Sequence, residues 1–426
     1  MALNYIFVGF FLCSFVVAII RTIGYYFRDF FAETLAITFD KTDLNVFPAM
    51  VQSTFDMAET SLTIVIYLIG IMTLWLGIMK IGEKGGAIQV LSKWVSPFFQ
   101  KLFPDLPKNH PASGSIIMNF SANMLGLDNA ATPLGLKAME DLQSLNKQKD
   151  TASNAQIMFL VLNTSGLTLI PISVLALRGA AGASNPSDIF IPILLATFFA
   201  TLGGLIVTAL YQKINLFNTT ILKWLGGLTV LIIAFIWFLT SLPQEKIEMI
   251  SRVSGNFILF GVIVTFLILG LKSKINIYET FIEGAKEGFQ VGIKIIPYLV
   301  AMLVAIGVFR ASGTLDLITG GIKWVFNSMG FAANFVDALP TAFMKPLSGS
   351  GARAMMVETM DTFGADSFAG RLSAIFQGST ETTFYTIAVY YGAINIKKTR
   401  YTATAGLLAD FIGIISAIFI AYLFFG

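Results

Sequence analysis

Polar side chains interrupt the apolar runs of this 426-residue chain at four places. Within a membrane, helix-end N–H groups freed by such interruptions bind anionic groups, and freed carbonyl oxygens bind cations. Amide and hydroxyl side chains at the same places add hydrogen-bonding partners for a polar solute. We therefore predict a substrate-binding site made by Asn123, Asp128, Asn129 and Thr132, by Asn163, Thr164, Ser165 and Thr168, by Ser348 and Ser350, and by Gln377, Ser379, Thr380, Glu381 and Thr382.

The same side chains have a structural interpretation. Small and hydroxyl-bearing residues let membrane helices approach closely and hydrogen-bond across the contact. For an isolated Ser or Thr we favour this packing role. For four clusters that recur at matched places in two halves of the chain, we favour a binding site.

Glu381 is the most informative single residue, because an ionised side chain within an apolar span costs several kcal/mol unless it is paired or hydrated. It is expected to carry a proton or a cation, or to bind a polar group of a solute. The structural alternative is an ion pair with Arg353 or Lys345. Asp128 has a similar interpretation, although an N-cap role at the start of a helix explains it equally well.

Several classes of function are excluded or disfavoured by composition. One cysteine, Cys13, and one histidine, His110, exclude a disulfide framework and a Cys/His metal site. No nucleophile–base pair or trio of metal ligands is visible, so we expect no enzyme, no metal and no cofactor. The net charge of +3 is spread thinly, and no Lys/Arg cluster indicates a nucleic-acid partner.

The elements that position these residues are predicted to be membrane helices. The chain is 55% hydrophobic and only 12% charged, whereas soluble domains carry roughly 25% charged residues. Seven apolar runs are long enough to cross a bilayer, near 3–21, 61–82, 187–212, 219–241, 254–272, 288–309 and 401–425. Two more runs, 155–178 and 368–391, are interrupted by the polar clusters. We predict an all-α polytopic membrane protein with about nine transmembrane segments.

The remaining half-apolar stretches are too short or too polar to span a bilayer. They are expected to form interfacial or re-entrant pieces near 87–103, 112–145, 315–330 and 335–364. The first run is interpreted as a retained helix, since it lacks the basic start and the cleavage site of a signal peptide.

An internal repeat divides the chain into two halves. The segment beginning at Phe55 aligns with the one beginning at Phe281, and both end in Lys-Trp-Val. Residues 126–140 then align with 344–358, and 163–174 with 377–388, in the same order. We predict a first half over 1–212, a linker with a joining helix over 213–253, and a second half over 254–426.

The number of crossings decides how the halves are related. If each half crosses four times, the joining helix 219–241 makes the second half enter inverted. Inverted repeats with broken helices are a recurring architecture of secondary transporters. If a broken segment is a hairpin instead, the repeats are parallel. The Lys/Arg distribution does not settle the orientation.

Two groups of segments resemble known families. KLFPDLPKNHPASGSIIMNFSANMLGLDNAATPLGLKAME, from Lys101, and FLVLNTSGLTLIPISVLALR, from Phe159, resemble spore maturation protein A. Residues 278–313, KPLSGSGA, DSFAGRLSAIFQGSTETTFYTIAVYYGA and GLLADFIG resemble spore maturation protein B. The chain resembles a fusion of the two, each half with a nucleoside-recognition or Gate domain. Related Gate segments occur in transporters of nucleosides, ferrous iron and dipicolinate, so the resemblance implies a transporter-like membrane core.

We therefore expect a transporter or permease for a small polar solute: a nucleoside-like molecule, a small organic anion or an ion. The alternative is a membrane scaffold or assembly factor that acts in envelope or spore maturation. The expected location is the bacterial cytoplasmic membrane. The expected partners are the lipid bilayer and the solute, and a homo-oligomer is left open.

Overall fold

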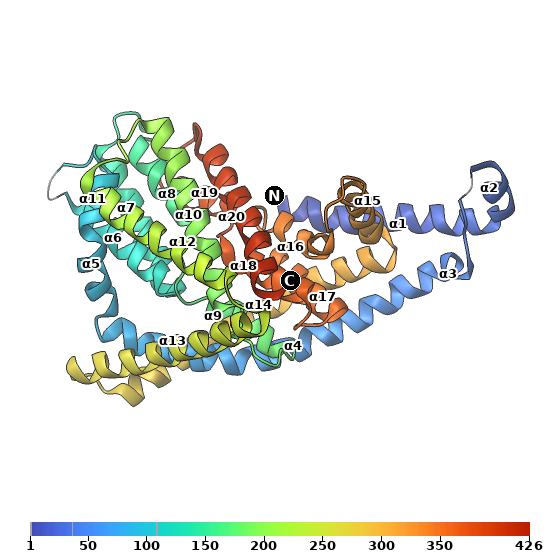
Figure 1. The fold of residues 1–426 in the computed structure, drawn as a ribbon, viewed down its shortest axis with the longest axis horizontal. Coiled ribbons are helices and arrows are strands. Elements are labelled where there is room, and N and C mark those ends of the chain that lie inside the picture. Colours follow the sequence, from blue (N-terminus) through green and yellow to red (C-terminus); the bar gives the residue numbers. More distant parts are fainter. Residues whose placement is uncertain (1, 36, 108–109) are drawn as a thin grey trace.

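Two long helices, α4 (Val46–Lys84) and α14 (Ile277–Ala311), pack against each other in opposite directions along the length of the molecule (Figure 1). The computed structural model describes residues 2–35, 37–107 and 110–426, without the side chains of 2–3 and 128–130. The side chains of Asp128 and Asn129, two of the predicted site residues, therefore lie outside the description. The described residues form an all-helical structure, as predicted, apart from one isolated bridge between Thr151 and Lys398.

The first half contains ten helices, and three short or joining elements lead to the second half. The first-half helices besides α4 are α1 (Ala2–Tyr26), α2 (Arg28–Leu35), α3 (Lys41–Leu44), α5 (Ala87–Leu102), α6 (Pro111–Met124), α7 (Asp128–Leu145), α8 (Asn154–Ser165), α9 (Ile172–Ala180) and α10 (Phe190–Gln212). The joining elements are α11 (Thr219–Ile221), the π-helical turn η1 (Leu222–Gly226) and α12 (Gly227–Thr240). The second half adds to α14 the helices α13 (Gln244–Lys272), α15 (Thr314–Ser328), η2 (Asn334–Ala338), α16 (Leu339–Met344), α17 (Gly349–Phe363), α18 (Phe368–Ser379), α19 (Thr383–Ala393) and α20 (Thr402–Phe425).

Seven helical segments in the described chain are long and apolar enough to cross a membrane. They correspond to the seven uninterrupted runs of the sequence and include Thr219–Thr240, of which only 6% is buried inside the structure. The two interrupted runs form broken pairs instead, α8 with α9 and α18 with α19. Each member is too short to span alone.

Glycine allows α4 and α14 to approach closely. Gly284, Gly288 and Gly292 recur at every fourth position of α14, so they share one face of the helix. A methyl group on Gly288 would lie 2.6 Å from the carbonyl oxygen of Met72 on α4. This small-xxx-small spacing is a typical contact between membrane helices, because it brings the two backbones together.

The two broken pairs lie head to tail. Near the start of α8, the carbonyl of Ala152 accepts a hydrogen bond of 3.0 Å from Arg400, which follows α19. Near the start of α18, the carbonyl of Ala365 accepts one of 2.6 Å from Arg178 in α9. Each pair therefore begins beside the end of the other, and the breaks meet in the middle. Helices α10 and α20 also run in opposite directions beside them.

A buried charge network joins the halves where α9 ends and α18 begins. Arg178 is fully buried, and its Nη2 lies 2.9 Å from Asp188 and 3.1 Å from Asp366. Arg371 contacts the same two carboxylates. Burial raises the pKa of Asp366, but hydrogen bonding with Ser184 and the charges of both arginines outweigh it, and the pKa is lowered. This contribution to stability is therefore present at neutral pH and lost in acid, as Asp366 is protonated.

Gly288→Ala should destabilise the protein by about 1–3 kcal/mol, because the added methyl meets the backbone of α4, which cannot move aside cheaply. Thermal unfolding in detergent measures the effect. Gly70→Ala on α4 is the matched control, since nothing lies within 4 Å of its added methyl. Equal melting temperatures for the two variants would contradict the close contact between α4 and α14.

Arg178→Met should destabilise the protein by about 3–5 kcal/mol, because it leaves the buried carboxylate of Asp188 and the partly exposed one of Asp366 without one of their cations. The control is Lys398→Met, which removes the exposed ion pair with Asp150 at the other meeting of the broken pairs. Exposed pairs contribute only about 0–1 kcal/mol. An Arg178 variant that melts with the control would show that the network does not hold the halves together.

Candidate functional site

A polar cavity of about 710 Å³ lies where the two breaks meet. Four chain segments line it: the end of α6 with the start of α7, the first break, the turn before α17, and the second break. Ten of the predicted site residues face it: Asn123, Thr132, Asn163, Thr168, Ser348, Ser350, Gln377, Thr380, Glu381 and Thr382. Its size is within the range of sites for small molecules.

Backbone conformation opens the helices at both breaks. The helix α8 ends at Gly166, which has a φ of 57° in the left-handed region that favours glycine. A methyl group there would also lie 3.2 Å from the backbone nitrogen of Glu381. The helix α18 ends at Thr380, whose backbone is extended with φ −145° and ψ 174°. Helical structure resumes at Ile172 and Thr383.

Neighbouring segments satisfy the backbone groups that the breaks release. The N–H of Glu381 donates to the carbonyl of Thr164 at 2.7 Å, which links the second break to the first. The N–H of Leu169 donates to Met124 at 2.7 Å, and that of Phe384 to Pro346 at 3.1 Å. Unwound backbone is tolerated at membrane depth only where such partners or a lined cavity are available.

A chain of amide side chains fixes one wall. Asn163 Nδ2 donates to the carbonyl of Phe159 at 2.9 Å, and its Oδ1 accepts from Asn123 at 2.9 Å. Asn119, deeper in α6, donates to the carbonyl of Ala131 at 2.8 Å. On the opposite break, Gln377 is buried, and its Oε1 has no hydrogen-bond partner among the described residues. That oxygen is enclosed by neighbouring protein atoms, although other atoms of Gln377 line the cavity.

Two basic side chains in the cavity were not predicted as site residues. Lys345 and Arg353 flank the start of α17, where Ser348 is the N-cap and its hydroxyl accepts from the N–H of Gly351 at 3.0 Å. The first turn of α17 holds no acidic residue. The usual charge preference at a helix N-terminus is thus reversed. The signal that could have revealed them is their spacing around the Ser-Gly-Ser-Gly turn.

Glu381 lies in the second break and is exposed to the cavity, as its place in the polar cluster of the interrupted run predicted. The extended conformation at Thr380 positions it there, because it ends α18 before Glu381. Among the described side chains, the cavity lining therefore combines one carboxylate with two cations. Tyr385 and Tyr390 also line the cavity and were not predicted.

Three predicted residues do not face the cavity. Thr164, Ser165 and Ser379 are buried at the ends of α8 and α18. Their neighbours are helices: an added methyl on Gly406 of α20 would lie 3.5 Å from Thr164. Whether any predicted residue binds a solute stays a prediction. In the described part of the chain, no group of three or more His, Cys, Asp or Glu residues could hold a metal ion.

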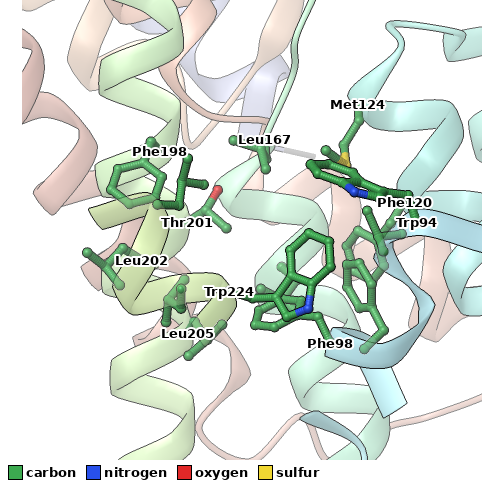
Figure 2. A pocket seen from close by; sticks show the side chains of 15 residues that line it. Trp94, Phe98, Phe120, Met124, Leu167, Phe198, Thr201, Leu202, Leu205 and Trp224 are labelled. Carbon is green, nitrogen blue, oxygen red and sulfur yellow. The ribbon is translucent and has the colours of Figure 1, made fainter. Parts of the chain in front are cut away.

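A second cavity of about 130 Å³ lies on the other side of the first break (Figure 2). Its lining is almost entirely apolar and includes Trp94, Trp224 and Leu167. Leu167 directly precedes Thr168, which lines the polar cavity, so the first break separates the two spaces. In the repeat alignment Leu167 corresponds to Glu381, and the two breaks therefore differ in chemistry.

Comparison with known proteins connects this geometry to a family. The family described as Gate, nucleoside recognition, matches residues 65–181 and 292–397, more than half of the chain. Spore maturation protein B of Bacillus subtilis (strain 168) is 46% identical over 165 residues, which are 39% of this chain and 91% of that protein. Spore maturation protein A of the same organism is 45% identical over 156 residues, 37% of this chain and 80% of that protein.

No solved structure matches the chain. The two sequence matches each cover less than half of the chain, as expected for a fusion of two such proteins. With two Gate regions and similarity to both spore maturation proteins, the chain belongs to the Gate nucleoside-recognition family of membrane proteins.

Proposed function

We propose that the protein is a membrane transporter or permease for a small polar solute, which binds in the cavity between the two broken helix pairs. The observation that carries this proposal is the convergence of both breaks on one cavity of about 710 Å³. Packing alone requires no polar space of this size between the halves. Many secondary transporters bind their substrates between broken helices near the middle of the membrane.

The halves are proposed to be inverted repeats, with each broken pair as one crossing, which gives about nine transmembrane segments. Supporting this, the corresponding helices α4 and α14 run in opposite directions, as do α10 and α20. The broken pairs also lie head to tail, with Arg400 and Arg178 in similar roles. Because the relatives are bacterial, the bacterial cytoplasmic membrane is the proposed location.

Among the expected solutes, one with an anionic group fits the cavity best. Among the described lining side chains, two cations, Lys345 and Arg353, face one carboxylate, Glu381, and both flank a helix N-terminus that favours negative charge. Arg353 lines the cavity and brings a permanent positive charge to it.

The function is tested with the purified full-length protein in liposomes. Uptake and binding are measured for a panel of nucleosides, small carboxylates and divalent metal ions. Flux of a small carboxylate is the expected result. Folded protein that neither binds nor transports any member of the panel would overturn the proposal and favour the scaffold.

Arg353→Gln should weaken binding of the transported carboxylate by about 10- to 100-fold, since a hydrogen bond to a charged group contributes roughly 1.5–3 kcal/mol. The fold should survive, because the lost Nε has no internal partner among the described residues. Binding is measured by isothermal titration calorimetry. Arg252→Gln, on the exposed face of α13, is the control and should bind as the wild type does.

Glu381→Gln should leave the free energy of unfolding within about 1 kcal/mol of the wild-type value, because exposed carboxylates contribute little to stability. Solute flux, in contrast, should be lost or uncoupled. The backbone hydrogen bond from residue 381 to Thr164 does not depend on the side chain. Proteoliposome flux and thermal unfolding are compared with Glu140→Gln, an exposed residue outside the cavity. A Glu381 variant that unfolds would identify the carboxylate as structural.

A further inference from the structure

A second carboxylate lies behind the second break, inside the span α20. Asp410 is only 2% exposed. Its Oδ2 accepts a hydrogen bond of 2.5 Å from the hydroxyl of Thr383, the first residue of α19. Its Oδ1 is buried and has no hydrogen-bond partner among the described residues. An ionised carboxylate with one hydrogen bond is costly in such surroundings, whereas the neutral acid is not.

Two glycines of α20 allow the second break to pack closely against Asp410. Gly406 and Gly413 lie four residues before and three residues after Asp410, so all three share one face of α20. A methyl group at Gly413 would lie 3.0 Å from Thr380, and one at Gly406 would lie 2.8 Å from Thr383. This face of α20 therefore packs directly against the residues of the second break, with Asp410 between the two glycines.

The first half has the same packing without the carboxylate. There α10 packs through Gly204, where an added methyl group would lie 3.5 Å from Ser165 at the end of α8. In the second half, α20 packs through Gly413, where an added methyl group would lie 3.9 Å from Ser379 at the end of α18. Three residues before each glycine stand Thr201 and Asp410, respectively. Thr201 has an ordinary helix-packing role, since its hydroxyl donates to the carbonyl of Ser165 at 3.4 Å. Packing at this position thus does not require an acid.

The charged surroundings of Asp410 are sparse. Of the helices that pack against α20, α8, α10 and α19 carry no Asp, Glu, Lys, Arg or His. The helix α18 carries Arg371, which pairs with Asp188 and Asp366, and α13 carries its charged residues toward its two ends. The charged side chains whose fields reach Asp410 are Lys345 and Glu381, and both line the polar cavity. The Thr380 hydroxyl also faces Asp410, while Thr380 itself lines the cavity.

We propose that Asp410 is a proton-binding site, loaded from the cavity across the Thr380–Thr383 turn, and that its protonation is coupled to the solute site. The coupling rests on the proposed transport function; the proton binding does not. The two sites share one short segment: Thr380, Glu381 and Thr382 face the cavity, and Thr383 bonds Asp410. Ionised Asp410 accepts a hydrogen bond from the Thr383 hydroxyl at Oδ2. A proton on either carboxyl oxygen removes the charge that strengthens this bond, and a proton on Oδ2 reverses its direction. Protonation therefore changes the hydrogen bond that holds the turn beside the solute site.

Proton binding is tested by infrared difference spectroscopy of the full-length protein in lipid, with no added solute, between alkaline and acid pH. Wild type should show a carbonyl band of a desolvated, protonated carboxyl group. Asp410→Asn should lose this band, and Asp316→Asn, an exposed carboxylate on α15, should retain it. A band that persists in Asp410→Asn, or a wild type without any such band, would overturn the proposal.

Thr383→Val keeps the test valid if Asp410→Asn fails to fold. Valine has nearly the shape of threonine but cannot hydrogen-bond, so the Asp410 band should remain and shift in frequency. An unshifted band would contradict the assignment to Asp410.

Transport measurements test separately whether protonation of Asp410 is coupled to solute flux. In proteoliposomes, an imposed pH gradient should accelerate wild-type carboxylate flux at least several-fold, and the flux of Asp410→Asn should not respond. A wild type that transports nothing defeats the proposed function but leaves the infrared result standing. Wild-type flux that ignores the gradient, together with an Asp410 band, defeats the coupling alone.

Discussion

The hydrogen bond from the N–H of Glu381 to the carbonyl of Thr164 is the interaction on which the centre of the structure depends. A membrane interior provides no water for unpaired backbone groups, so two interrupted helices are stable there only if each supplies partners for the other. The head-to-tail arrangement of the broken pairs achieves this. It also leaves side chains between the breaks without close packing, and the polar cavity occupies that space.

The long helices and the broken pairs join the two halves of the chain through different interactions. The glycine face of α14 against α4 fixes one contact between the halves through close backbone packing. The Arg178 network fixes another through charges that lie where α9 ends and α18 begins. Between these contacts, backbone hydrogen bonds from Glu381, Leu169 and Phe384 and the glycine face of α20 hold the breaks in place.

Much of the core arrangement could be predicted from sequence because one constraint governs it. Polar residues within apolar runs, such as Asn163 and Gln377, mark unwound backbone, and their repetition indicates that the breaks correspond. Lys345 and Arg353 could not be assigned in this way, because their direction depends on how α16 and α17 fold back. Asp410 stands in an otherwise apolar run, and an ionisable residue within a span is a signal that could have identified it. The residue at which the second helix breaks could not be predicted within the polar cluster, because it depends on a single extended residue, Thr380, which ends α18.

The joining helix α12 shows what covalent fusion contributes. Only 6% of the membrane-length segment Thr219–Thr240, which α12 completes, is buried, so this segment mainly connects the two halves. Docking of the second half onto the first thus becomes an intramolecular event, governed by an effective concentration that dilution of the protein does not lower. The buried Arg178 network, which two separate chains would have to assemble at each encounter, is instead formed once in every molecule. The ratio of the two halves is then fixed at one to one by synthesis, and neither half is left with its charged end unpaired in the bilayer.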